Sequence, residues 1–139
     1  MLDSLNKYKG LSLLFVRLAL GIVFLMHGVG KLFNIGPTPV GLAGFSGWLE
    51  SLGVPAAGFA ALVVALIETI GGLLVLVGLW TRPAALGIAV VMLVAFFMVH
   101  VSKGFSVGNG GYEFVLVLFL SALALLFGGP GETWVLKKL

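Results

Sequence analysis

Four long apolar runs, separated by short segments rich in glycine, proline and polar residues, dominate the sequence. They cover residues 11–33, 56–79, 83–101 and 112–127. The first three are long enough to cross a bilayer as helices, whereas the fourth, with 16 residues, falls short of the roughly 18 that make a clear span. None alternates strictly between apolar and polar residues as a barrel strand does. The pattern predicts an all-α integral membrane protein, a four-helix transmembrane bundle.

Residues that favour turns mark the ends of these runs. The segment 34–39 closes the first run with a glycine and two prolines, and the segment 128–131 closes the fourth with three glycines and a proline. Between the second and third runs, Thr81 precedes Pro83 by two residues. Because a threonine hydroxyl can accept a hydrogen bond from a free backbone N–H, Thr81 is predicted to cap the third helix.

The first loop contains a short amphipathic pattern within residues 40–53. Its large apolar residues fall on one helical face, and its polar residues fall elsewhere. The apolar face consists of Phe45, Trp48, Leu49 and Leu52; the polar residues are Ser46, Glu50 and Ser51. We expect a short helix in the membrane interface, with Trp48 at headgroup level. Such a helix serves either as a lid over the bundle or as a simple anchor.

The composition agrees with a membrane protein. Hydrophobic residues make up 60% of the 139 residues and charged residues 9%, and the mean hydropathy is +1.22. The length predicts one domain over residues 1–139. The first run resembles a signal peptide but is longer, contains Arg17 and lacks a small-residue cleavage site, so we expect a retained helix. The chain has no cysteine, which excludes disulfides and a dithiol relay of its own.

Basic residues flank the apolar runs, a distribution that predicts topology rather than nucleic-acid binding. With four spans, one side of the membrane carries Lys7, Lys9, Arg82, Lys137 and Lys138, and the other carries Lys31 and Lys103. This bias predicts that both termini are cytoplasmic and that the first and third loops face outward. The lipid bilayer is the predicted environment of the chain.

Small residues recur along the predicted helices. They are Gly21 and Gly28 in the first run, Gly71, Gly72 and Gly78 in the second, and Gly87 in the third. Glycine lets two membrane helices approach closely, so these positions predict helix contacts within the bundle.

Two ionisable residues lie inside the apolar runs, Arg17 in the first and Glu68 in the second. Charge at membrane depth is costly and indicates a functional residue with a partner. Taking the first run to begin and the second run to end at the same membrane edge, the helix rise leaves an axial offset of roughly 7 Å, which a long arginine side chain spans. The sequence thus favours a buried Arg17–Glu68 ion pair or a proton site. The alternatives are that the pair only fixes the register of the two helices, or that Arg17 extends to the interface and Glu68 is protonated.

A second set of polar residues is expected near the outer mouth. His27 and Lys31 are four residues apart and share a helical face; His100 and Lys103 end the third run, and Glu113 begins the fourth. By the predicted topology these groups lie at similar depth, so they are expected to form one ligand-binding pocket.

Several uses compete for this pocket. A quinone headgroup needs imidazole or lysine donors, a nearby carboxylate and apolar walls, and the predicted residues provide all three. A haem between His27 and His100 is disfavoured by their unequal depth. A metal ion held by His27, His100 and Glu113 is disfavoured because no ligand motif is present. The remaining interpretation is that these polar residues only anchor the ends of the helices.

The third run also contains Phe96, Phe97 and Met98. These are interpreted as packing or lipid-facing residues rather than a cofactor site.

The order of several short motifs resembles the DoxX family of small bacterial membrane proteins. These motifs are residues 17–21 leading to 27–32, then 52–55, then Glu68 ahead of 71–74 and 78–82, and finally 128–131. The resemblance implies a four-helix protein of the bacterial inner membrane and a redox role, since relatives of the DoxD type are similar to subunits of a thiosulfate:quinone oxidoreductase.

Together these observations predict a quinone-interacting redox subunit acting with a partner. A partner is needed because the chain has no cysteine and no flavin or nucleotide motif. The alternative is a non-enzymatic scaffold or a carrier of a lipid or small molecule, and a homo-oligomer is compatible with either.

Overall fold

The chain folds into helices joined by short loops. The structure is a computed structural model that describes residues 6–131; Lys137 and Lys138, two of the basic residues used to predict topology, lie outside these residues. The five α-helices are α1 (Lys9–Phe33), α2 (Gly41–Ser51), α3 (Ala57–Val77), α4 (Thr81–Ala95) and α5 (Glu113–Gly128). After α4 the chain continues as a π-helix, η2 (Phe96–His100), and two 3₁₀-helices, η3 (Val101–Lys103) and η4 (Val107–Asn109).

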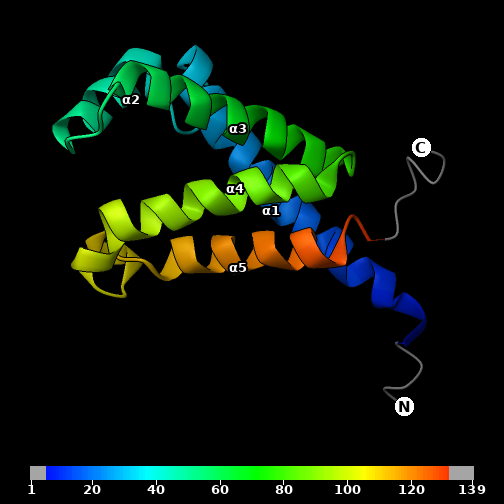
Figure 1. Cartoon of the computed structure of the whole chain (residues 1–139). Coiled ribbons are helices and arrows are strands. Elements are labelled where there is room, and N and C mark those ends of the chain that lie inside the picture. The colour runs from blue at the N-terminus through cyan, green and yellow to red at the C-terminus, as the bar shows by residue number, and fades with distance from the viewer. Residues whose placement is uncertain (1–5, 132–139) are drawn as a thin grey trace.

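The long helices run back and forth between two ends of the molecule. Figure 1 shows α2 and the loops around η3 and η4 at one end, which we call the α2 end. The first turns of α1 and the last turn of α5 lie at the other end, which we call the terminal end. Three helical stretches of the described residues are long and apolar enough to cross a membrane, Gly10–Phe33, Ala57–Val77 and Thr81–Lys103, and α5 is a shorter apolar helix. The sequence therefore predicted the helical class and the positions of these segments correctly.

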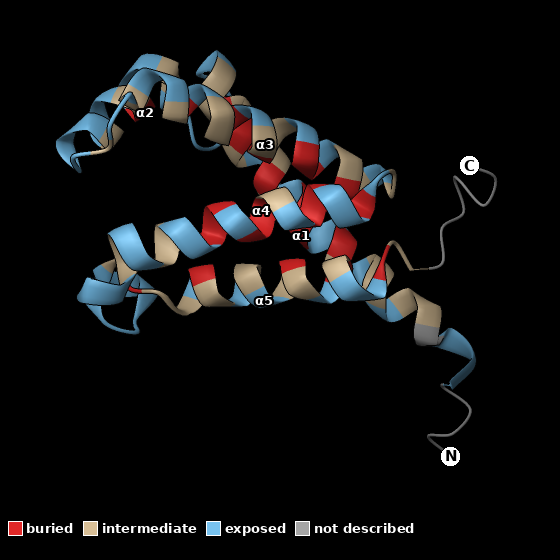
Figure 2. Ribbon diagram, viewed as in Figure 1, coloured by how far each residue is buried: buried red, intermediate tan, exposed pale blue. Residues whose placement is uncertain are grey.

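The core forms where α1, α3, α4 and α5 face one another. Buried positions follow the inner stripes of these helices, whereas their outer faces are exposed (Figure 2). The largest fully buried side chains are Phe24, Leu20, Ile88, Leu125 and Val75. The exposed outer faces are rich in leucine, isoleucine, valine and phenylalanine, as expected for helices whose surroundings are lipid rather than water.

Glycines bring α1 and α3 into close contact, as the sequence predicted. A Cβ atom placed on Gly21 would lie 2.8 Å from Cβ of Leu76, and one on Gly72 would lie 2.5 Å from the backbone nitrogen of Leu25. Gly28 meets Thr69 in the same way. These approaches leave no room for a side chain, and they fix the register of the two helices.

The prediction for Thr81 was wrong. The N-cap of α4 is Trp80, which adopts a left-handed conformation with φ 46° and makes no side-chain capping hydrogen bond. Thr81 is the first helical residue instead, and its hydroxyl is buried without a hydrogen-bond partner in the described part of the chain. The reason is that α3 ends at Val77 and the turn from Gly78 to Trp80 is short. The helix α4 therefore begins at Thr81 itself, whereas a cap at Thr81 would require it to begin at Arg82.

Candidate functional site

A cavity of about 410 Å³ opens between the helices toward the α2 end. All five α-helices and η2 contribute to its wall, which is mostly aliphatic and aromatic. Four polar side chains interrupt this wall: His27, Lys31, Glu68 and His100. A mainly apolar cavity of this size with a few polar groups is typical of a small-molecule site.

The rim of this cavity is apolar. The exposed residues that line it are Trp48, Leu52, Val94, Met98 and Phe114. They come from α2 and its C-cap, from α4 and η2, and from α5. A mouth without polar side chains faces hydrocarbon more favourably than water. The cavity is therefore suited to a ligand that enters from the bilayer. Met98 also lines the cavity, whereas Phe96 packs on the ring of Tyr112.

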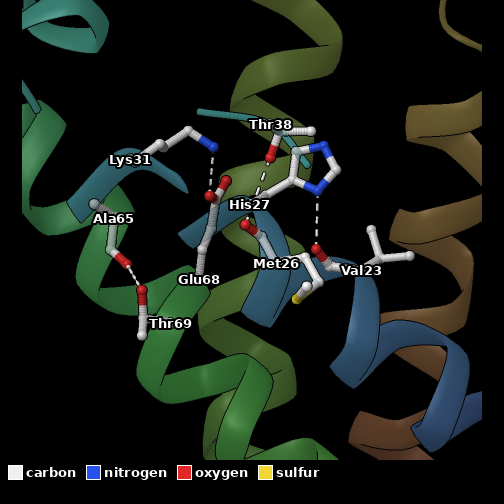
Figure 3. A network of polar contacts seen from close by, with 8 residues as sticks. All are labelled: Val23, Met26, His27, Lys31, Thr38, Ala65, Glu68 and Thr69. Carbon is white, nitrogen blue, oxygen red and sulfur yellow. Dashed lines mark hydrogen bonds and ion pairs between the residues drawn. The ribbon is translucent and has the colours of Figure 1, made fainter. Parts of the chain in front are cut away.

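The central polar contact is an ion pair between Lys31 on α1 and Glu68 on α3. The Lys31 Nζ atom lies 2.5 Å from Glu68 Oε2, and the two side chains are 13% and 6% exposed. Figure 3 shows both side chains pointing into the space between the two helices. The predicted ion pair between Arg17 and Glu68 was wrong, because Lys31 occupies the position assigned to Arg17.

The register of α1 and α3 explains this correction. Moving four residues along α1 from Gly21 to Leu25 moves the contact four residues back along α3, from Leu76 to Gly72. Continued to the α2 end, this register brings Lys31 next to Glu68. The sequence-based offset assumed that α1 begins at the level where α3 ends, but α1 extends past α3 at the terminal end (Figure 1).

Arg17 lies at the terminal end, away from the cavity. Its side chain is buried, with 5% exposed, and its Nη1 donates a hydrogen bond of 2.7 Å to the carbonyl oxygen of Pro130. Arg82 Nη2 lies 3.5 Å from the carbonyl oxygen of Phe127. Two positive side chains at the carbonyl end of α5 complement the helix dipole. This geometry gives Arg17 a structural role in holding the end of α5.

Replacing Arg17 by glutamine is expected to lower the free energy of unfolding by about 2 kcal/mol, because the buried guanidinium loses its charged hydrogen bond to the partly buried carbonyl oxygen of Pro130. Occupancy of the cavity should not change. Unfolding monitored by circular dichroism in detergent measures the first effect. The matched control is Arg82→Gln, whose contact is longer and whose side chain is exposed; it should cost less than about 0.5 kcal/mol. Loss of ligand binding in Arg17→Gln at unchanged stability would contradict this assignment.

His27 contributes one ring nitrogen to the polar cluster. Its Nδ1 lies 2.9 Å from the carbonyl oxygen of Val23, one turn earlier on α1 (Figure 3). A carbonyl oxygen only accepts hydrogen bonds, so Nδ1 carries the proton and Nε2 is left to accept or release one. His27 therefore presents an atom suited to proton exchange in the wall of the cavity.

His100 reaches the cavity because η2 is a π-helix. Ala95 also lines the cavity, and His100 follows it by five residues. In an α-helix, residues five apart point about 140° away from each other. In a π-helix the hydrogen bonds join residues five apart and the turn is wider, so side chains five residues apart lie closer to one face than in an α-helix. The His100 Nδ1 donates a hydrogen bond of 2.7 Å to the carbonyl oxygen of Gly110, which again leaves Nε2 for a ligand.

Two residues of the predicted outer cluster lie elsewhere. The carboxylate of Glu113 accepts a hydrogen bond of 2.6 Å from the backbone N–H of Val107 and closes the loop before α5. Lys103 is exposed and packs beside Gly110. Neither lines the cavity, so the prediction that they join the pocket was wrong. Within residues 6–131, no three histidine, aspartate or glutamate side chains gather closely enough to hold a metal ion.

The predicted short helix in the first loop is α2, and its apolar face covers the cavity. Phe45, Trp48, Leu49 and Leu52 all line it. The Phe45 ring is buried, lies 4.9 Å from Lys31 Nζ and stacks on Trp48 at 5.8 Å. A cation held over an aromatic ring is a favourable contact. The position of α2 is thus that of a lid, and Lys31 connects this lid to Glu68.

Comparison with known proteins places the chain in a family. The DoxX family model matches residues 12–101, which is more than half of the chain. The chain belongs to the DoxX family. All the cavity residues of α1 to η2 lie within this match, whereas α5 follows it. No solved structure matches the chain significantly.

Similar DoxX relatives match nearly the full length. A protein of Haemophilus influenzae is 34% identical over 94% of this chain and 92% of its own length. The inner membrane protein YqjF of Escherichia coli is 33% identical over 91% of each chain. CatD of Bacillus subtilis, provisionally assigned as an oxidoreductase, is 34% identical over 87% of this chain and 83% of its own. The family match, the inner membrane relative YqjF and the long apolar helices together show that this is a membrane protein.

Proposed function

We propose that this DoxX protein is a four-span subunit of the bacterial inner membrane that binds a quinone headgroup in the cavity beneath α2. In this arrangement α5 is the fourth span, and the basic residues of the sequence orient both termini toward the cytoplasm. The observation that carries the proposal is the cavity itself, in which His27, Lys31, Glu68 and His100 interrupt an apolar wall behind an apolar rim.

The polar groups match the needs of a planar ring with two carbonyl oxygens. Lys31 supplies a charged donor, and the protonated forms of the two histidines supply donors through Nε2. Glu68 supplies a carboxylate that exchanges a proton with a hydroxyl of the reduced ring. The apolar rim, which includes Trp48 and Phe114, suits an isoprenoid tail that remains in lipid.

Electron transfer needs a second protein. Interconversion of quinone and quinol moves two electrons and two protons. The chain contains no cysteine and the sequence has no flavin or nucleotide motif. The residues of this chain therefore bind and orient the quinone and exchange protons with it, and a partner subunit exchanges the electrons. The provisional oxidoreductase assignment of CatD is compatible with this role.

Binding of a short-chain ubiquinone should quench the fluorescence of Trp48, which lines the cavity. A variant with Trp80→Phe and Trp134→Phe leaves Trp48 as the sole tryptophan among the three in the chain. In this background, His27→Ala and Glu68→Gln are each expected to weaken binding at least about tenfold, equivalent to about 1.4 kcal/mol. Glu50→Gln, which alters an exposed residue of α2 outside the cavity wall, is the matched control.

Extraction of the purified protein gives an independent check. Mass spectrometry of the extract should detect a quinone in the wild type and less of it in His27→Ala. Retention of phospholipid alone, unchanged in the variants and without quinone-dependent quenching, would contradict the proposal and favour the lipid or small-molecule carrier. A Soret band in the visible spectrum would instead assign His27 and His100 to haem.

A further inference from the structure

A second cavity shares its wall with the first. It has a volume of about 340 Å³ and is lined by His27, Lys31, Thr38, Pro39 and Val40. His27 and Lys31 line both cavities. These two side chains therefore form a polar partition between two spaces.

The loop after α1 builds this second cavity. The backbone N–H groups of Asn34 and Val40 both donate hydrogen bonds to the carbonyl oxygen of Gly30, at 3.2 and 3.3 Å. A side chain on Gly30 would collide with the backbone of Thr38, so glycine is needed for the loop to lie directly on α1. Thr38 also contacts the carbonyl oxygen of Met26 through its hydroxyl, at 3.5 Å. The loop is thereby held over His27.

The two cavities differ in their surroundings. The first has an apolar rim, as described above. The outer wall of the second is formed by Thr38, Pro39 and Val40, which are exposed and which belong to the loop at the α2 end, beyond the last turn of α1. Exposed loop backbone and the hydroxyl group of Thr38 are compatible with water and not with hydrocarbon.

We propose that the second cavity is an aqueous entry through which His27 exchanges protons with water at the α2 end. The ring is suited to this step because Nδ1 donates a hydrogen bond to the carbonyl oxygen of Val23, which leaves Nε2 free to accept and release a proton. In the step, once the Glu68 carboxylate has taken up a proton from a bound ligand, Nε2 of His27 accepts that proton and then releases it to water in the second cavity, and Glu68 returns to its ionised form beside Lys31. Only a proton moves, and no electron transfer is required. The other titratable groups in the walls around His27 are Lys31 and His100.

This assignment separates the routes of ligand and proton. A membrane-soluble ligand enters through the apolar rim, and protons reach the same polar cluster from the opposite side of the partition. The aqueous entry does not depend on which ligand occupies the first cavity. It is therefore tested without any ligand.

The chain has no cysteine, so single-cysteine variants can be labelled without background. Thr38→Cys and His27→Cys are placed in sealed vesicles and treated with a membrane-impermeant cationic methanethiosulfonate reagent. The control is Met26→Cys, because Met26 is the neighbour of His27, is 39% exposed and lines neither cavity. A thiolate forms readily in water and poorly among apolar groups, so His27→Cys should react about a hundredfold faster than Met26→Cys.

A second measurement uses the unmodified chain. With nitrogen-15 in its two histidines, the ring signals of His27 should appear in a water-edited spectrum of the protein in lipid, and His100→Gln assigns the signals. Equal labelling rates for His27→Cys and Met26→Cys, or His27 ring signals that receive no magnetisation from water, would overturn the proposal. The water-edited spectrum keeps the test valid if the cysteine variants do not fold.

Discussion

Replacing Lys31 by methionine is expected to lower the free energy of unfolding by about 3 kcal/mol, because the change leaves the Glu68 carboxylate buried without its partner. The two side chains are 13% and 6% exposed, so water cannot take over the lost interaction. The lysine also contributes its contact with the Phe45 ring. Unfolding of the purified protein in mixed detergent, followed by circular dichroism, measures the loss.

The double variant Lys31→Met with Glu68→Leu separates the ion pair from its burial. Removing both charges eliminates the unpaired carboxylate, so the double variant should be more stable than Lys31→Met alone. Lys103→Met is the matched control, since Lys103 is exposed and forms no ion pair with residues 6–131; it should change the stability by less than about 0.5 kcal/mol. An additive double variant would show that the two side chains do not interact.

The same variants also test the connection between the polar cluster and the lid. Lys31 contacts Glu68 on α3 and the ring of Phe45 on α2. Loss of the lysine should therefore loosen α2 before the rest of the molecule unfolds. Faster hydrogen exchange in residues 41–51, with unchanged exchange in α5, is the expected pattern.

The helical segments and the closeness of α1 and α3 could be predicted from the sequence, because they depend on local composition. Long apolar runs specify membrane helices, and glycine specifies where two of them approach. The amphipathic pattern around Phe45 and Trp48 likewise predicted α2 and its apolar face. That face covers a cavity, which was one of the two uses the sequence left open.

The partner of Glu68 could not be predicted in the same way. It depends on the axial offset of α1 and α3, and this offset depends on how far α1 extends past α3 at the terminal end. The glycines contain this information only as a set of paired contacts, such as Gly21 with Leu76 and Gly72 with Leu25. Matching the glycines of the two runs would have brought Lys31, rather than Arg17, to Glu68.

His100 illustrates a different limit. The sequence placed it near the pocket by depth, but an α-helix would turn it away from Ala95 and the cavity. Its position depends on the π-helical turn at Phe96–His100, for which the apolar pattern contains no signal. Glu113 was misplaced for a related reason, since a local hydrogen bond to Val107 determines where its carboxylate lies.

Replacing Gly72 by alanine is expected to destabilise the protein by about 3 kcal/mol or to prevent folding, because the added methyl group has no space. Its Cβ would lie 2.5 Å from the backbone nitrogen of Leu25 and 3.0 Å from its Cα. A backbone cannot move aside as a flexible side chain does, so α1 and α3 must separate. The same unfolding measurement, together with the yield of monodisperse protein, detects the effect.

Two glycines provide matched controls for this change. Gly47 lies in α2 with no atom within 4 Å of an added Cβ, so Gly47→Ala should be neutral or stabilising by up to about 1 kcal/mol. Gly87 lies in α4, where the nearest atom is a side-chain methyl of Ile67 at 3.3 Å; a small shift of that side chain should keep the cost below about 1 kcal/mol. Equal losses at all three positions would show that the close contact between Gly72 and α1 is not the cause of the destabilisation.

Gly72→Ala should also weaken the candidate site, because Gly72 is one helical turn from Glu68 on α3. Separation of α1 and α3 moves Lys31 and His27 away from the carboxylate, so any folded fraction should lose quinone-dependent quenching of Trp48. Gly87→Ala should keep it. Normal quenching in a destabilised Gly72→Ala protein would mean that the cavity does not depend on this helix contact, and that the polar cluster is positioned by α2 and η2 instead.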